Sequence, residues 1–140
     1  MIGNNTFTKT VDILHRGMST SSLRQAVIAN NLANADVPNF KRTDVNFESE
    51  LKRALDTEKY RPALELRRTH PTHIADWEPR DYRDVKPRRV LDYLTQSDNN
   101  GNNVDQEEEF NLLLKNQLRY MLLADMANFE FSQVTMVLRG

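Results

Sequence analysis

Apolar residues recur at alternating intervals of three and four over the last third of the chain. This spacing turns one face of a helix towards a partner helix. Residues 104–139 contain neither proline nor glycine, and Asp105 followed by Glu108 has the form of a capping box at a helix start. The pattern therefore predicts one long helix over 104–139, with a stripe made of Phe110, Leu113, Gln117, Tyr120, Ala124, Ala127, Phe131, Val134 and Leu138.

The same helix carries apolar side chains outside this stripe, and they surround most of its circumference. Among them are Leu112, Leu114, Leu118, Met121, Leu122, Leu123, Met126, Phe129, Met136 and Val137. A helix that is hydrophobic on several sides must be buried on several sides. Because the rest of the chain has little apolar material to cover it, we expect neighbouring molecules to contribute.

The first segment of the chain repeats the same spacing and predicts a second long helix over 8–34. Its stripe consists of Phe7, Val11, Leu14, Met18, Ser21, Gln25, Ile28 and Leu32. The economical arrangement pairs the two terminal helices as an antiparallel coiled coil. We therefore expect a mainly α fold with an N-terminal helix in 1–35, a small irregular and β-containing region in 36–103, and a C-terminal helix in 104–140.

The middle region mixes charged residues with shorter apolar patterns. Residues 47–55 predict a short amphipathic helix. Prolines interrupt the chain after that, and we expect short strands at 63–67 and 89–94. The loop 96–103 is rich in asparagine, and we expect it to lie outside any core because it is so polar.

The first predicted helix ends in an asparagine-rich stretch at 29–41. Pro38 stops the helix and forces its predecessor into an extended conformation, while asparagine side chains can bond the backbone groups that are left open. The residues that characterise this turn are Asn30, Asn31, Asn34, Pro38, Asn39 and Phe40.

This turn resembles the N-terminal signature of the bacterial flagellar rod and hook proteins, which runs roughly Asn-Asn-x-Ala-Asn-x-x-Thr-Pro-Gly-Tyr-Lys. The sequence departs from it at Val37, Asn39 and Phe40. Asparagine tolerates a left-handed turn and phenylalanine keeps the ring, so we expect the turn itself to be retained. The stretches 66–74 and 101–105, with 116–120, are similar to the proximal members of the basal body rod protein family, whose middle region is short.

The resemblance implies a mechanical function. The chain would be a structural subunit of the proximal rod, polymerising with itself and other rod proteins into the shaft that transmits torque and forms part of the export channel wall. Its partners would include the membrane-ring and rod-adaptor proteins of the basal body. Family members leave the cytoplasm through the flagellar type III export apparatus, without a cleaved signal peptide, and assemble in the periplasmic space.

The helical stripes then become candidate contacts between helices and between subunits. From the first helix we select Val11, Leu14, Met18, Ile28 and Leu32. From the second we select Phe110, Leu113, Tyr120, Ala124, Phe131, Val134 and Leu138.

Composition adds little chemistry to this picture. The formal net charge is −1 and there is no cysteine, which gives no reason to expect nucleic acid as a partner and excludes a thiolate metal site. No secretory signal or membrane-spanning run is evident. The chain also lacks a phosphate-binding glycine loop and a Ser-His-Asp order, so we expect no catalysis, no cofactor and no small-molecule substrate.

Two other readings stay open at this point. One is a soluble coiled-coil adaptor or chaperone in the cytosol. The other is a metal-dependent enzyme centred on His70 and His73, with Asp76 as a further ligand. We expect no metal there, because Pro71 separates the two histidines and no third strong ligand has a habitual spacing.

Overall fold

The computed structural model describes residues 6–59, 69–73, 80–95 and 99–139. The chain divides into two compact units. The first, the helix-pair unit, contains residues 1–45 and 89–140, and the second, the α2 unit, contains residues 46–88.

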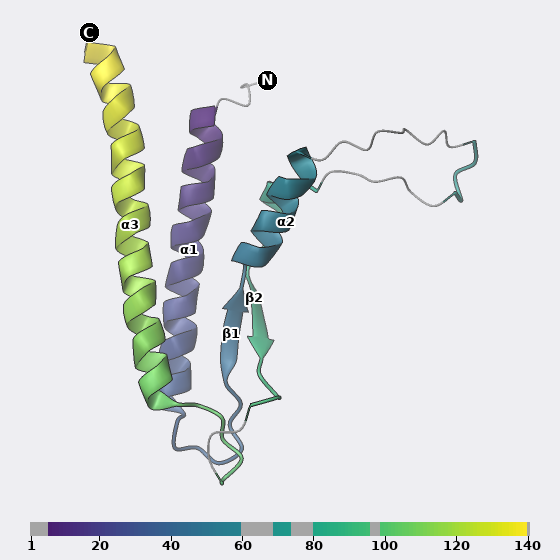
Figure 1. Ribbon diagram of the computed structural model, residues 1–140, viewed down its shortest axis with the longest axis vertical. Helices are drawn as coiled ribbons and strands as arrows, with labels where there is room; N and C mark the ends of the chain where they lie inside the picture. Colours follow the sequence, from purple (N-terminus) through teal and green to yellow (C-terminus); the bar gives the residue numbers. More distant parts are fainter. Residues whose placement is uncertain (1–5, 60–68, 74–79, 96–98, 140) are drawn as a thin grey trace. The chain divides into compact units, whose positions relative to one another are not determined.

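Two long helices dominate the helix-pair unit. Helix α1 spans Thr6–Ala33 and helix α3 spans Gln106–Arg139, and they lie side by side and run in opposite directions (Figure 1). The Oδ1 atom of Asp105 accepts hydrogen bonds from the first turn of α3, as a helix N-cap does. The prediction of a mainly α fold with its terminal helices in contact is confirmed.

Contacts along the pair show the antiparallel register. The rings of Phe7 and Phe131 meet edge to face, with centroids 5.9 Å apart and planes at 82°. Further along, the side-chain nitrogen of Asn116 donates to the carbonyl oxygen of Ser21 at 2.8 Å. A buried asparagine between two helices favours one register, because a shifted register would leave it without its partner.

The buried face of α3 contains polar as well as apolar residues. Its buried and half-buried side chains recur at helical intervals, and we call this face the seam. The seam consists of Glu109, Leu112, Leu113, Asn116, Leu123, Ala124, Ala127 and Glu130. On α1, Leu14 and Ile28 are among the buried apolar residues.

A second face of α1 adjoins a two-stranded antiparallel sheet. Strand β1 is Thr43–Asn46 and strand β2 is Arg88–Leu91. The carbonyl oxygen of Arg42 accepts the backbone N–H of Asp92 at 2.8 Å, which continues the pairing beyond the strands. Strand β2 lies inside the predicted strand 89–94, apart from its first residue, whereas the predicted strand 63–67 falls outside the described residues.

The α2 unit contains helix α2, Glu48–Lys59, and a single 3₁₀ turn, Tyr82–Asp84, which contact each other. Ala54 of α2 is fully buried. Its neighbour in the sequence, Arg53, and the more distant Arg80 both form ion pairs with Glu50, at 3.2 and 3.0 Å. Helix α2 confirms the short amphipathic helix predicted over 47–55.

Across the described residues, no helix is long and apolar enough to span a membrane.

Gly17 is where a side chain would disturb the helix pair. A Cβ atom there would lie 3.1 Å from Cδ1 of Leu123, tighter than ordinary contact. Replacing Gly17 by leucine should force the helices apart and lower the free energy of unfolding by about 1–3 kcal/mol, the usual cost of overpacking. Urea denaturation followed by circular dichroism measures this.

The matched control is Ser19→Leu on the exposed side of α1, which should change stability little. Adding Leu123→Ala to Gly17→Leu should recover part of the lost stability, because it removes the side chain against which the new leucine would clash. Equal effects of the two leucine substitutions would contradict the close approach of α1 and α3.

Candidate functional site

A group of polar side chains ties the end of α1 to the start of α3. We call it the junction, and it consists of Asn31, Arg42, Asn102, Asn103 and Glu109. All five lie in the helix-pair unit, and all except Arg42 are buried. Buried polar groups cost free energy unless they are hydrogen-bonded, so their partners show what the junction holds in place.

Asn102 closes the turn that follows α1. Its side-chain nitrogen lies 3.0 Å from the carbonyl oxygen of Asn34, 2.7 Å from that of Ala35 and 2.8 Å from that of Val37. Its Oδ1 accepts the backbone N–H of Val104 at 2.7 Å. One buried amide therefore bonds three carbonyl oxygens of the turn that follows α1 and also fixes the approach to α3.

Asn103 links the same approach to the sheet. Its Oδ1 accepts the backbone N–H of Arg42 at 2.6 Å, and its nitrogen donates to the carbonyl oxygen of Asp92 at 2.7 Å. The nitrogen also lies 3.1 Å from the hydroxyl of Thr95. The segments before β1 and after β2 are thereby both attached to the start of α3.

Asn31 of α1 covers the outer edge of β1. Its side-chain nitrogen donates to the carbonyl oxygen of Thr43 at 2.8 Å, and its Oδ1 accepts the N–H of the same residue at 3.1 Å. Two turns earlier, Arg24 donates to the carbonyl oxygen of Val45 at 3.1 Å. These side chains take the place of a neighbouring strand, so the edge of β1 is satisfied.

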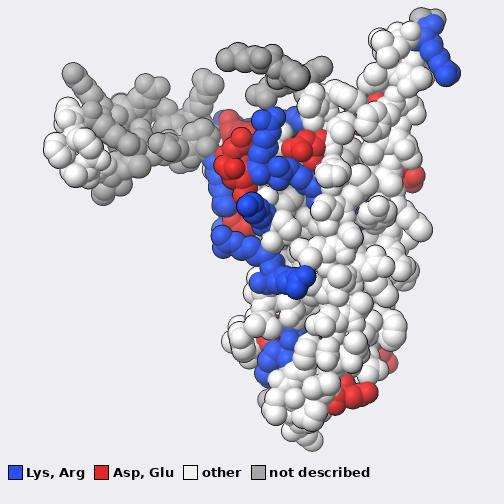
Figure 2. All heavy atoms as spheres, turned by 180° about the vertical axis from the view of Figure 1, so that it is seen from behind, with Lys and Arg blue, Asp and Glu red and all other residues white. Residues whose placement is uncertain are grey.

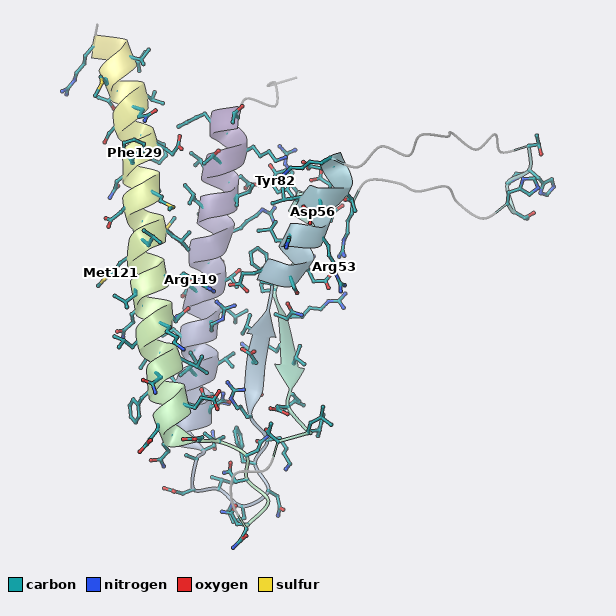
Figure 3. All side chains as sticks on the ribbon, in the orientation of Figure 1. Arg53, Asp56, Tyr82, Arg119, Met121 and Phe129 are labelled. Atoms are coloured by element: carbon teal, nitrogen blue, oxygen red, sulfur yellow. The ribbon has the colours of Figure 1, made fainter. Side chains whose placement is uncertain are left out.

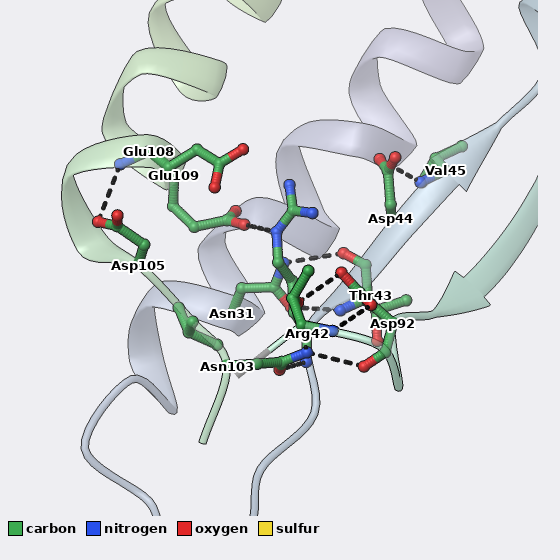
Figure 4. Close-up of polar contacts among 12 residues, drawn as sticks. Asn31, Arg42, Thr43, Asp44, Val45, Asp92, Asn103, Asp105, Glu108 and Glu109 are labelled. Atoms are coloured by element: carbon green, nitrogen blue, oxygen red, sulfur yellow. Dashed lines mark hydrogen bonds and ion pairs between the residues drawn. The ribbon is translucent and has the colours of Figure 1, made fainter. Parts of the chain in front are cut away.

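Arg42 and Glu109 form an ion pair inside the junction (Figure 4). Nε of Arg42 donates to Oε1 of Glu109, whose side chain is fully buried. Burial alone would lower the pKa of Arg42, but its hydrogen bond to Glu109 and the charge of that carboxylate outweigh this effect and raise the pKa. The guanidinium therefore keeps its charge until strongly alkaline pH, and the attraction within the pair persists up to there.

The turn after α1 and the loop before α3 also contact each other directly, next to the junction. Asn39 has a φ of 61°, the left-handed region expected for this turn position, and its N–H donates to the carbonyl oxygen of Asn100 at 3.1 Å. Gly101 has a φ of 79°, and a Cβ there would lie 2.7 Å from Oδ1 of Asn39. Lys41 donates to the carbonyl oxygen of Gly101 at 2.7 Å. Gly101 is thus required both by its conformation and by this close approach.

The other prominent feature is an apolar stripe on α3 that the described residues leave uncovered. We call it the outer stripe, and its side chains are between 56% and 74% exposed. It consists of Phe110, Leu114, Leu118, Met121, Phe129 and Met136. In Figure 3 the side chain of Met121 points away from α1. Figure 2 shows α3 as a long column with few charged atoms on the visible face.

Comparison with known proteins identifies the kind of molecule that carries these features. Residues 12–41, which hold most of α1 and the turn that Asn102 closes, match the family described as flagella basal body rod protein. The chain is 42% identical to the flagellar basal body rod protein FlgB of Borreliella burgdorferi, over 96% of its own length and 99% of that relative. It is 34% identical to FlgB of Bacillus subtilis, with 96% of each chain covered.

The chain belongs to the FlgB family of flagellar basal body rod proteins. This is a structural family without enzymatic activity, and the flagellar basal body rod is where its members are found. The resemblance drawn from the asparagine-rich turn is confirmed.

For an FlgB family member, the candidate interface residues fall into two groups. Leu14 and Ile28 are buried, and Val11, Met18, Leu32, Leu113 and Ala124 are half-buried. The exposed members are Phe110, Tyr120, Phe131, Val134 and Leu138. The seam of α3 lies mostly one residue before the predicted stripe, because Glu109 and Asn116 occupy two of its positions. The role of these residues between subunits stays a prediction.

The residues of the signature turn also differ in their surroundings. Asn31 is fully buried and Asn34 is half-buried, with its side chain bonded to the carbonyl oxygen of Asn30 at 2.7 Å. Pro38 and Asn39 are exposed, and Phe40 is half-buried. Of these asparagines, Asn31 connects α1 directly to the sheet.

The expectation that the loop 96–103 lies outside the core is wrong for its last residues. Asn102 is fully buried and Asn103 is nearly so. Polarity is a poor guide to burial here because both side chains find hydrogen-bond partners in distant segments. A run of asparagines directly before a helix start was the available signal, but nothing local reveals those partners.

His70 and His73 both lie at the surface. The rings of His70 and His73 have centroids 5.9 Å apart, and Nδ1 of His70 lies 2.7 Å from the hydroxyl of Thr72. Asp76 falls outside the described residues. Within the described ranges, no group of three metal-binding side chains comes together.

Asn102 gives the first test of the junction. Asn102→Ala should lower the free energy of unfolding by about 2–4 kcal/mol, because several buried backbone groups lose a partner at once. Asn102→Asp should also destabilise the protein, since a carboxylate cannot donate to three carbonyls. Chemical denaturation measures both, with Asn99→Ala at an exposed position as the control.

Asp92 offers a test by titration. Hydrogen bonds from the hydroxyl of Thr95 and the backbone N–H of Leu94 hold the pKa of Asp92 below its ordinary value of 3.8. A lowered pKa means that this stabilisation is complete above the ordinary value and is lost as the pH falls through the folded value. Thr95→Val should raise the pKa of Asp92, as measured by NMR of its carboxyl carbon. An unchanged pKa would contradict the hydrogen bond.

Proposed function

We propose that the outer stripe of α3 packs against the terminal helices of neighbouring rod subunits, both copies of this chain and related rod proteins. The observation that carries the proposal is the amount of apolar surface that α3 leaves exposed. Thirteen of its large apolar side chains are between 37% and 81% exposed. Exposed apolar surface on this scale is typical of an interaction site.

The distribution of this surface also supports assembly. Leu14 and Leu123 help to bury one face of α3 against α1, whereas the outer stripe runs along much of the helix on another face. A helix with apolar residues on two faces can pack between neighbours on two sides. This arrangement suits a subunit that is surrounded by similar helices in a tube.

In such a tube the helix pair would serve a mechanical role. Packed terminal helices would carry torque along the shaft and form part of the wall of the export channel. The membrane-ring and rod-adaptor proteins would contact the subunit at the base, and the flagellar type III export apparatus would deliver it. The family membership supports these partners, and the junction supports the rigidity that the role requires.

A charge on the outer stripe tests the proposal. Leu118→Glu and Met121→Glu should leave the helicity and thermal stability of the isolated chain nearly unchanged, because both side chains are exposed in it. In the assembled rod the same charge would be buried without a partner at a cost of several kcal/mol. We therefore expect loss of swimming when either variant replaces the natural chain in its own bacterium.

Lys115→Glu is the matched control, since it changes charge on the same helix outside the stripe. The amount of exported chain is measured in each strain, so that a failure of export is distinguished from a failure of assembly. Normal swimming with Leu118→Glu would overturn the proposal. A stable small oligomer in the cytosol would instead support an adaptor or chaperone.

A further inference from the structure

A groove opens between the first half of α1 and the second half of α3. It has a volume of about 440 Å³ and is lined by Thr10, Leu14, Asp125, Met126, Phe129 and Glu130. Leu14 is buried, while Met126 and Phe129 remain 46% and 61% exposed. The groove therefore presents apolar surface that a side chain from outside could cover.

The groove also carries negative charge. Asp125 is exposed and Glu130 is half-buried, and both belong to its lining. In the described part of the chain, neither carboxylate has a cation within ion-pair distance. An apolar groove with two acidic residues favours an occupant that joins apolar side chains to a positive charge.

The end of α3 has this combination. Because Phe7 lies against Phe131, close to the first residue of α1, the last turns of α3 extend past the start of α1. We call residues 133–139 the overhang. Met136 is 74% exposed and Val137 81% exposed, and the helix ends in Arg139.

We propose that the overhang of one copy of this chain occupies the groove of a second copy. The proposal rests on the proposed function, since it names one of the contacts by which subunits would pack. Val137 and its neighbours cover Met126 and Phe129, and Arg139 approaches the carboxylates of Asp125 and Glu130. Charge complementarity selects this occupant over an uncharged apolar segment.

The contact joins two different surfaces and is therefore heterologous. Contacts of this type add copies head to tail and produce an open helical array when the rotation does not close a ring. The overhang and the groove are centred roughly ten residues apart on α3, which corresponds to about 15 Å along the helix. Parallel copies joined in this way would be displaced axially by about that distance.

Disulfide cross-linking tests the contact, because the natural chain contains no cysteine. One chain carries Met126→Cys, a second carries Val137→Cys, and both are produced together in the source bacterium after deletion of its own gene. A mild oxidant is added to swimming cells, and cross-linked dimers are measured. The control pairs Val137→Cys with Ser22→Cys, an exposed site of α1 away from the groove.

We expect about tenfold more dimer from the groove pair than from the control pair, because a maintained contact raises the effective concentration of the two thiols. A single chain with both Met126→Cys and Val137→Cys should give a ladder of larger products. Asp125→Lys should reduce the dimer several-fold, and Arg139→Glu on the other chain should restore it.

Measuring swimming distinguishes a failure of the overhang contact from a failure of the proposed rod function. Cells that swim and give no more dimer than the control overturn the overhang contact while the rod function stands. A lack of rescue by Arg139→Glu overturns the ionic part of the contact. Cells that swim equally well without any copy of the chain would overturn the rod function itself.

Discussion

The rest of the structure depends on one constraint, which is that buried amide groups must find hydrogen-bond partners. The Asn102 side chain donates to the turn after α1, and the Asn103 side chain accepts from Arg42 before β1 and donates to Asp92 after β2. The bonds of Asn102 to the turn and of Asn103 to Arg42 join residues more than sixty positions apart. The junction thereby sets the point from which α1 and α3 run side by side, and the seam follows from it.

The sequence was sufficient to predict the helices because their signals are local. Spacing, the N-cap Asp105 and the stop at Pro38 locate both helices to within two residues at each end. The exact face of α3 was not predictable in the same way. Glu109 reads locally as a residue suited to a helix start, and only its pairing with Arg42 explains its complete burial.

The sequence predicted that α3 carries more apolar surface than the chain itself can cover, but it did not predict which residues form that surface. Excess apolar residues around α3 indicated that neighbouring molecules cover it, and the outer stripe agrees with that expectation. The seam differs from the heptad stripe because Asn116 takes a place that an apolar residue would normally fill. Hydrogen-bond partners in another helix cannot be read from spacing alone.

Among the described residues, the network of polar contacts described above lies at one end of the helix pair. The junction holds the end of α1 to the start of α3, whereas at the opposite end the rings of Phe7 and Phe131 meet only through an apolar contact. Apolar contacts are not directional and tolerate small displacements. The pair is thus fixed at the junction and held by an apolar contact at its other end. Under the proposed packing, it would keep its register at the junction while its opposite tips adjust to neighbouring subunits.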